Sequence, residues 1–154
     1  MSIFPEAQAK AILTKVVGFS QADECTAQLN GATRGNVRFA RNDVSTAGVT
    51  DDVQLAVQVA FGKRVGTATI NQFDDASLQR VVRRAEELAR LAPENPEFMP
   101  AVPQQTYLKT NTFSAPTAAI DPAYRAKVAG DSIGPCRAEN LVAAGYLEDQ
   151  AGFV

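Results

Sequence analysis

Apolar and polar residues alternate most regularly between positions 53 and 61, which predicts a β-strand with one apolar face. Gly62 and Lys63 follow as a two-residue hairpin turn, and residues 64–71 are predicted to return antiparallel. A shift of one residue would expose every large apolar side chain of the first strand, so the pattern specifies the register. These side chains are Val53, Leu55, Val57, Val59 and Phe61.

Shorter alternating runs precede this hairpin and predict further strands. Residues 25–29 and 37–39 alternate, and Gly31 and Gly35 are predicted to lie in turns around them, as Asn-Gly and Arg-Gly pairs. Residues 41–43 are predicted to form a polar turn.

A weaker run continues from Val44 to Val49, with Gly48 as a candidate β-bulge. The stretch from residue 30 to residue 71 is therefore predicted to be a set of short antiparallel strands joined by tight turns. It is the centre around which the rest of the chain is organised.

A helix is predicted on each side of these strands. Residues 5–19 carry Pro5 in the first turn and an apolar stripe at helical spacing. Residues 75–91 carry a longer apolar stripe, with Asp74 or Asp75 as the cap, and should lie across the apolar face of the sheet. The charged residues opposite this stripe are interpreted as a solvent-exposed face.

The last third of the chain changes in character. Five prolines between Pro93 and Pro116 predict an extended connector, whose apolar side chains are expected to hold it on the domain surface. A helix is predicted from Asp121 and Pro122, with a break at Gly134-Pro135. The predicted elements that follow are a strand at 141–147, a turn at 148–150 and the start of a return strand at 151–154.

These elements predict an α+β fold, in which an antiparallel β-sheet has helices packed on one face and the helix–hairpin order is weakly duplicated. Residues 1–92 form the predicted helix–antiparallel sheet–helix core, residues 93–120 the Pro-rich extended connector, and residues 121–154 a helix and the start of a truncated second hairpin. A half-formed apolar hairpin would leave an edge that invites association. The chain is therefore expected to be one N-terminal domain of a longer protein.

The composition argues against several kinds of catalytic and metal-binding site. The 154 residues include no histidine, which is the commonest general base and metal ligand. Cys25 and Cys136 lie far apart and form no C-x-x-C motif. Two part-buried thiols in a reducing compartment are the simplest interpretation, with a disulfide or a catalytic role as the alternatives.

Charge and hydropathy point to a cytoplasmic protein. The net charge of −2 argues against general nucleic-acid binding, which needs a positive surface. No basic and apolar secretory signal begins the chain, and no apolar run approaches the ~20 residues that span a bilayer. No nucleic-acid or membrane partner is expected.

Several segments together resemble the TldD/PmbA family, also labelled modulators of DNA gyrase. Their order and spacing carry the resemblance more than any single motif, and they cover most of the chain. The segments are Arg38 to Asn42, the G-x-R-x-G turn of Gly62, Arg64 and Gly66, the helix with Ala85 and Ala89, the exit at residues 92–96, and residues 136–146.

The resemblance implies a zinc metallopeptidase whose zinc site lies in the C-terminal half, on a helix with an H-E-x-x-x-H motif completed by a downstream cysteine. This chain has no histidine, and Cys25 and Cys136 do not occupy that position. Zinc is therefore expected in the missing C-terminal catalytic domain. No cofactor, metal ligand or catalytic residue is expected here, so the chain alone is not expected to be an enzyme.

The resemblance implies that the chain retains the family's N-terminal domain. In the family this domain packs against the catalytic half and helps to form a homo- or heterodimer that encloses a cleft for unfolded peptide. An independent protein-interaction module, of the gyrase or toxin-control type, is the alternative. The two adjacent carboxylate pairs, at residues 51–52 and 74–75, are interpreted as turn and capping residues rather than a catalytic pair.

One group of polar residues is a candidate interface. They lie at predicted turns and on the more polar face of the sheet, and exposed surface charge is the simplest interpretation. The alternative is an edge that meets the missing half, a partner subunit or an extended peptide by β-augmentation. The candidates are Arg38, Arg41, Asn42, Lys63 and Arg64.

Overall fold

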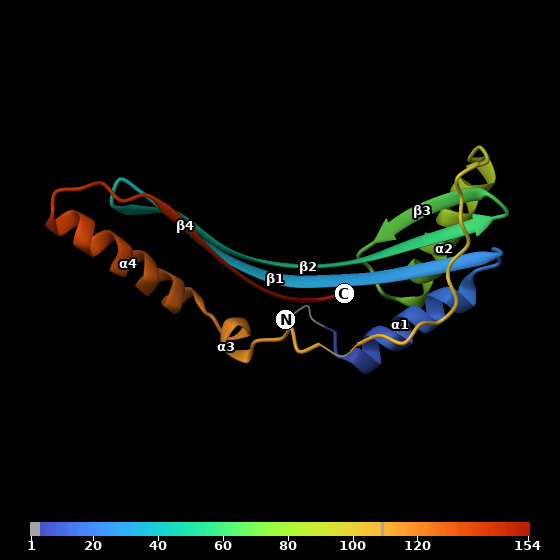
Figure 1. Ribbon diagram of the computed structural model, residues 1–154, viewed down its shortest axis with the longest axis horizontal. Coiled ribbons are helices and arrows are strands. Elements are labelled where there is room, and N and C mark those ends of the chain that lie inside the picture. Colours follow the sequence, from blue (N-terminus) through green and yellow to red (C-terminus); the bar gives the residue numbers. More distant parts are fainter. Residues whose placement is uncertain (1–3, 109) are drawn as a thin grey trace. The chain divides into compact units, whose positions relative to one another are not determined.

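The computed structural model describes residues 4–108 and 110–154 (Figure 1). Its strands form one sheet in the order β3-β2-β1-β4, which together with the helices confirms the predicted α+β class. The elements are α1 (Glu6–Phe19), β1 (Glu24–Ala40), β2 (Asp43–Phe61), β3 (Arg64–Ile70), α2 (Asp75–Leu91), α3 (Ala115–Ala118), α4 (Pro122–Ala138) and β4 (Gly145–Phe153).

The described residues form two compact units, and β1 and β2 contribute to both. The two-helix unit comprises residues 4–31, 53–108 and 153–154, and contains α1, α2 and β3. The hairpin unit comprises residues 32–52 and 110–152, and contains the β1–β2 turn, α3, α4 and most of β4.

The core of the two-helix unit follows the predicted alternation of β2. Leu55, Val57 and Val59 are buried on one face, where they pack with the apolar stripe of α2. Each such burial stabilises the fold by ~1.5–3 kcal/mol. The predicted hairpin is confirmed, because Gly62 has a φ of 57° and Phe61 pairs with Arg64.

Gly66 of β3 allows α2 to lie close to the sheet. A Cβ atom at this position would be 2.2 Å from the carbonyl oxygen of Ala85 and 2.3 Å from the backbone nitrogen of Ala89. Both facing residues on α2 are alanines and both are buried. The close contact between α2 and β3 therefore explains the small residues at all three positions, Gly66, Ala85 and Ala89.

Glu86 is a buried carboxylate on α2. It accepts a hydrogen bond from the backbone N–H of Gln21 at 2.7 Å and one from Arg83 at 2.9 Å, and Arg90 lies 3.9 Å away. Burial by itself would raise the pKa of Glu86, but these hydrogen bonds and the two arginines outweigh it and lower the pKa. The carboxylate thus joins the segment before β1 to α2.

We expect Glu86→Gln to lower the free energy of unfolding at pH 7 by about 1–3 kcal/mol, because charged hydrogen bonds to a buried carboxylate are lost. Since the folded pKa lies below the unfolded one, the stability from ionised Glu86 is present above the ordinary pKa of glutamate. It is lost as the pH falls through the folded value. Urea unfolding of both proteins between pH 7 and pH 3 should show the difference shrinking below about pH 4.3. A difference that stays constant with pH would contradict the assigned role.

β1 is one continuous strand, so the predicted turns at Gly31 and Gly35 are wrong. A Cβ atom on Gly31 would lie 2.3 Å from the ring of Phe153, and one on Gly35 would lie 2.1 Å from Arg125. Each glycine leaves room for a side chain from the C-terminal third of the chain. The sequence around Gly31 and Gly35 gives no sign of these distant side chains. The two glycines were therefore interpreted as turn residues.

The predicted break at Gly134-Pro135 is also wrong, because α4 continues to Ala138 with Pro135 inside it. Proline removes one helical hydrogen bond, usually at a cost of about 3 kcal/mol. Here it lies in the last turn, and the turns before it are held by Ala129 and Ile133, which are buried in a cluster with strand residues. This packing opposes the local tendency to break.

Residues 145–153 form the single strand β4, and not a strand, turn and return strand. The predicted second hairpin and the helix–hairpin duplication are therefore wrong, since the described residues 121–154 contain one helix and one strand. Within β4, Asp149 is bound by Arg125, and Gln150 accepts a hydrogen bond from Arg34 at 3.1 Å. These partners explain why a polar stretch that suggested a turn is extended.

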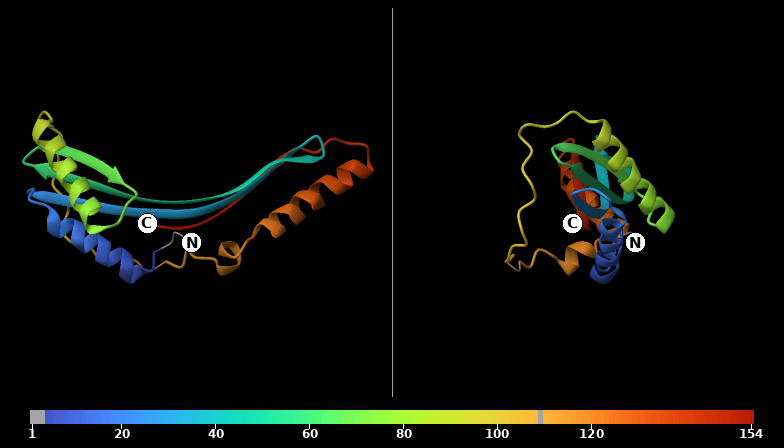
Figure 2. Two further views of the ribbon diagram at one scale, coloured as in Figure 1. Left: turned by 180° about the vertical axis from the view of Figure 1, so that it is seen from behind. Right: turned by 90° about the vertical axis from the view of Figure 1, so that its right-hand side faces the viewer.

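The described connector residues, 93–108 and 110–120, contain a turn at residues 96–97 and the short helix α3, and are otherwise without helix or strand (Figure 2). The connector's apolar side chains were expected to hold it on the surface, but Val102, Tyr107, Leu108 and Phe113 are exposed, with Leu108 at 92%. The expectation is wrong for these four residues. Separately, none of the helices in residues 4–108 and 110–154 is long and apolar enough to span a bilayer.

Candidate functional site

The five residues predicted as an interface fall into two groups. Arg38, Arg41 and Asn42 belong to the hairpin unit, at and beside the turn that precedes β2. Lys63 and Arg64 belong to the two-helix unit, at the turn that follows β2. Three of them therefore lie in one unit and two in the other, and the 19 residues of β2 lie between the two groups in the sequence.

Asn42 joins the β1–β2 turn to the segment that follows α4. Its φ of 62° is in the left-handed region, which asparagine tolerates in a tight turn. Its side-chain amide donates to the carbonyl of Leu141 at 2.9 Å and accepts from the N–H of Ala143 at 2.6 Å. Its own carbonyl accepts from Arg137 at 2.6 Å. Asn42 thus fixes the hairpin tip, whereas Arg38 and Arg41 stay exposed.

The second group holds the exit of α2. The carbonyl of Lys63 accepts a hydrogen bond from the N–H of Asn95 at 2.9 Å. The guanidinium of Arg64 lies 3.9 Å from the carboxylate of Glu94, an exposed pair of little energetic weight. These contacts join the G-x-R-x-G turn to the segment that follows α2.

The cysteines and carboxylates do not form a metal site. In residues 4–108 and 110–154, no three side chains of the metal-ligating types lie together. Cys25 lies in β1 and Cys136 in α4, and both are half-buried free thiols, as the simplest interpretation predicted. Burial raises the pKa of the Cys25 thiol, which disfavours the thiolate that a metal requires. The described residues therefore do not offer a ligand set for a catalytic zinc ion.

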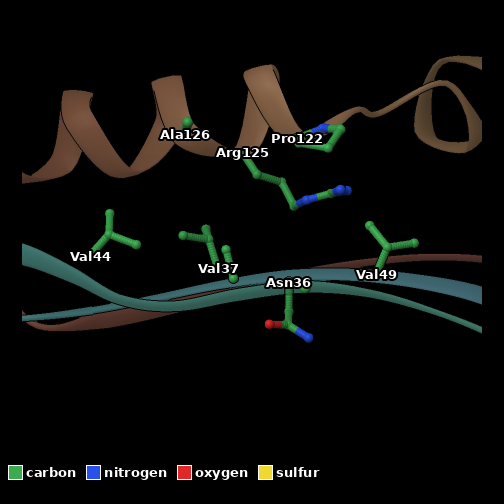
Figure 3. Close-up of a pocket in the computed structure, with 9 residues that line it drawn as sticks. Asn36, Val37, Val44, Val49, Pro122, Arg125 and Ala126 are labelled. Carbon is green, nitrogen blue, oxygen red and sulfur yellow. The ribbon is translucent and has the colours of Figure 1, made fainter.

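The hairpin unit contains an open groove of about 250 Å³ between α4 and the two strands. Figure 3 shows Val37, Val44 and Val49 pointing from the strands toward α4, and the side chain of Arg125 reaching from α4 into the space between them. The side chain of Asn36 points away from the groove. The residues around the groove are Asn36, Val37, Val44, Ala47, Gly48, Val49, Pro122, Arg125 and Ala126.

The direction of two valines reveals a bulge in β2. Val44 and Val49 both point toward α4, although they are five positions apart (Figure 3). Regular alternation would place residues at an odd separation on opposite faces of the sheet. One extra residue therefore lies between them, in the stretch that includes Gly48, as the sequence predicted.

Arg125 is the charged group of the groove. Its guanidinium donates to the carboxylate of Asp149 at 2.7 Å, and the two side chains are only 4% and 13% exposed. Gly35 provides the space for the guanidinium. Arg125 was not predicted as a site residue, although its spacing of four and eight residues from Ala129 and Ile133 places it on the buried face of α4.

Comparisons with known proteins agree with this fold. Residues 29–89 match a family model described as PmbA/TldA metallopeptidase domain 1. No curated protein sequence matches the chain. The structure of TldE from Thermococcus kodakarensis is similar with a TM-score of 0.77 and 14% identity, over 94% of this chain and 34% of that one.

Two proposed modulators of DNA gyrase share the fold as well. The protein from Bacteroides thetaiotaomicron has a TM-score of 0.66 and 11% identity, over 93% of this chain and 39% of that one. The protein from Thermotoga maritima has a TM-score of 0.69 and 9% identity, over 94% of this chain and 33% of that one. The chain thus spans about a third of the length of the solved chains that it matches. Over residues 29–89 the chain is thus similar to the first domain of the PmbA/TldA metallopeptidase family, and the solved structures share its fold.

Proposed function

We propose that this chain is the non-catalytic N-terminal domain of a TldD/PmbA-like zinc metallopeptidase, where it contributes to dimer assembly and to an enclosed peptide cleft. The observation that carries the proposal is an exposed apolar surface, in a chain whose described residues include no group of three metal-ligating side chains. Tyr107, Leu108 and Phe113 of the connector are exposed, and Val44 and Val49 line an open groove. Apolar surface of this kind is typical of protein–protein contacts.

Two further facts support a non-catalytic role for this domain and a zinc site elsewhere in the full-length protein. The family description names a metallopeptidase and this match as its first domain, and the chain covers a third of the related solved chains. A catalytic zinc ion needs about three protein ligands around an open position. Those ligands would come from residues outside this chain, in the C-terminal half of a full-length protein.

We expect the full-length protein to bind about one zinc ion and to hydrolyse unfolded peptide, and the 154-residue chain to do neither. Zinc is measured by elemental analysis after dialysis, and hydrolysis with a labelled unfolded peptide, on both proteins purified in parallel. Light scattering of the full-length protein tests the dimer. Stoichiometric zinc or hydrolysis by the 154-residue chain, or a monomeric full-length protein, would overturn the proposal.

The alternative function is an independent protein-interaction module. It is favoured by the description of two structural relatives as proposed modulators of DNA gyrase. A pull-down with gyrase as the candidate partner separates the two. Capture of gyrase by the 154-residue chain as well as by the full-length protein would support the module, and capture by neither would exclude it.

A further inference from the structure

The groove under α4 combines an apolar lining with one charged side chain. Val37 is 2% exposed, whereas Val44 and Val49 are 47% and 54% exposed, and all three point toward α4 (Figure 3). Arg125 is the one charged residue among the described residues that line the groove. Small-molecule sites have this composition, which is a mostly apolar lining with a few polar groups that orient the ligand.

Arg125 has hydrogen-bond donors that the protein does not use. An arginine side chain carries five N–H donors, and the Nη1 atom of Arg125 donates to Asp149 at 2.7 Å. Among the described residues, its Nε and Nη2 atoms have no hydrogen-bond acceptor. No fully enclosed side-chain nitrogen in that part of the chain lacks a partner, so Nε and Nη2 reach open space. Because the side chain extends into the groove, these donors are available to a molecule bound there (Figure 3).

The position of the guanidinium is fixed before any ligand binds. Asp149 holds it, only 4% of the side chain is exposed, and Gly35 leaves the space in which it lies. α4 itself is held by Ala129 and Ile133, which are buried against strand residues. A donor that is already ordered loses little conformational entropy on binding, which favours affinity.

The charge of the ion pair selects the kind of acceptor. Arg125 and Asp149 neutralise each other, so an anionic ligand would add an uncompensated negative charge to a largely buried pair. Asp121, the cap of α4 beside the groove residue Pro122, disfavours an anion further. A neutral carbonyl oxygen accepts hydrogen bonds from Nε and Nη2 without adding charge.

The volume of the groove limits the size of the ligand. An enclosed apolar cavity of about 150 Å³ holds benzene. The groove of about 250 Å³ therefore holds a single ring with a short substituent, and it is smaller than the ~300–1,000 Å³ sites of drug-sized molecules. Such a ligand would cover the exposed parts of Val44 and Val49 and release water from them.

We propose that the groove under α4 binds a small neutral carbonyl compound with an apolar ring or branched chain. The apolar part contacts Val37, Val44 and Val49, and the carbonyl oxygen accepts hydrogen bonds from Arg125. The inference goes beyond the proposed function, because it requires neither zinc nor the catalytic half. Val44 and Val49 also belong to the apolar surface of the proposed function, so the test includes the full-length protein.

The test is an NMR titration of the 154-residue chain at pH 7 with three probes of nearly equal size and shape. Acetophenone carries the carbonyl oxygen, N,N-dimethylaniline lacks it, and benzoate carries a negative charge. We expect acetophenone to bind with a Kd of about 1 mM and to shift the backbone amides of residues 44–49 and 123–126. The other two probes should bind about 10-fold more weakly, because N,N-dimethylaniline leaves Nε and Nη2 without an acceptor and benzoate adds a charge.

A double variant tests the role of Arg125. Arg125→Met with Asp149→Ala removes the donors and both buried charges together, so α4 is expected to stay packed. The roughly 10-fold preference for acetophenone over N,N-dimethylaniline should disappear, while the binding of N,N-dimethylaniline itself changes little. A purely structural role of Arg125 would weaken both probes equally, and that result would contradict the assigned contact.

A second variant and its matched control test the apolar lining. Val49→Thr keeps the shape of the side chain but places a hydroxyl group in the groove, so acetophenone should bind about 3-fold more weakly. Because Val49 is 54% exposed, the fold should be unaffected. Val142→Thr, at a side chain 72% exposed outside the groove, should leave binding unchanged.

Several results would overturn the proposal. These are no binding of acetophenone, equal or tighter binding of benzoate or N,N-dimethylaniline, or amide shifts confined to residues outside the groove. Loss of acetophenone binding in the full-length protein would show that a protein contact, and not a small molecule, fills the groove. The zinc and hydrolysis measurements are independent of these outcomes, so each proposal can fail alone.

Discussion

Replacing Gly66 by alanine is expected to lower the free energy of unfolding by about 3 kcal/mol. The new methyl group would meet backbone atoms of α2, at 2.2 Å from the oxygen of Ala85 and 2.3 Å from the nitrogen of Ala89. Backbone atoms cannot rotate away as a side chain can, so α2 must move off the sheet. That movement opens contacts with the most deeply buried part of the two-helix core.

The effect is measured by urea unfolding, or as a fall in melting temperature of about 6–12 °C for a domain of this size. Gly48→Ala is the matched control, because a Cβ atom there has no neighbour within 4 Å and the φ angle is not in the left-handed region. Its expected change is within about 0.5 kcal/mol. Equal stabilities of the two variants would show that α2 does not lie so close to β3.

Removing one partner of the Arg125–Asp149 pair is expected to cost about 3–5 kcal/mol, since an unpaired charge would remain buried. Asp149→Ala leaves the guanidinium, which is 4% exposed, without its carboxylate at 2.7 Å. α4 should then detach from β4 before the rest of the fold. Urea unfolding followed by the amide signals of α4 measures this.

Asp131→Ala on the same helix is the matched control. Its partner is Lys127, and the two side chains are 71% and 62% exposed, so we expect a change of less than about 1 kcal/mol. The double variant Arg125→Met with Asp149→Ala should recover most of the stability lost in Asp149→Ala, because no buried charge remains. A double variant as unstable as the single one would show that packing, and not charge, sets the cost.

The two largest effects lie at positions that differ in how well the sequence predicted them. The neighbourhood of Gly66 follows from local pattern, because the alternation of β2 and the stripe of α2 each specify one buried face and the short turn at Gly62 joins β2 to β3. Arg125 and Asp149 are 24 residues apart in sequence, and neither belongs to a pattern that names the other. The one sign in the sequence was the four-residue spacing of Arg125 from Ala129, which places Arg125 on the buried face of α4.

The candidate site was likewise predicted in part from the sequence and decided in part by the tertiary structure. The five candidate interface residues were grouped because they are predicted to lie at turns or on the more polar face of the sheet. They are Arg38, Arg41, Asn42, Lys63 and Arg64. In the structure they belong to two different units, and Asn42 holds the hairpin tip. The groove under α4 could not be predicted, because it needs a helix and two strands from distant parts of the chain.

The sequence by itself determined the elements whose signal is periodic, namely α1, α2, the β2–β3 hairpin and the start of α4 at Asp121. It also showed that the chain has no histidine to bind zinc, and it indicated a resemblance to the family. Only the tertiary structure decided the length of β1, the continuation of α4 through Pro135 and the single strand β4. The physical reason is that periodicity and capping act between near neighbours, whereas Gly31, Gly35 and Pro135 are governed by contacts made across the fold.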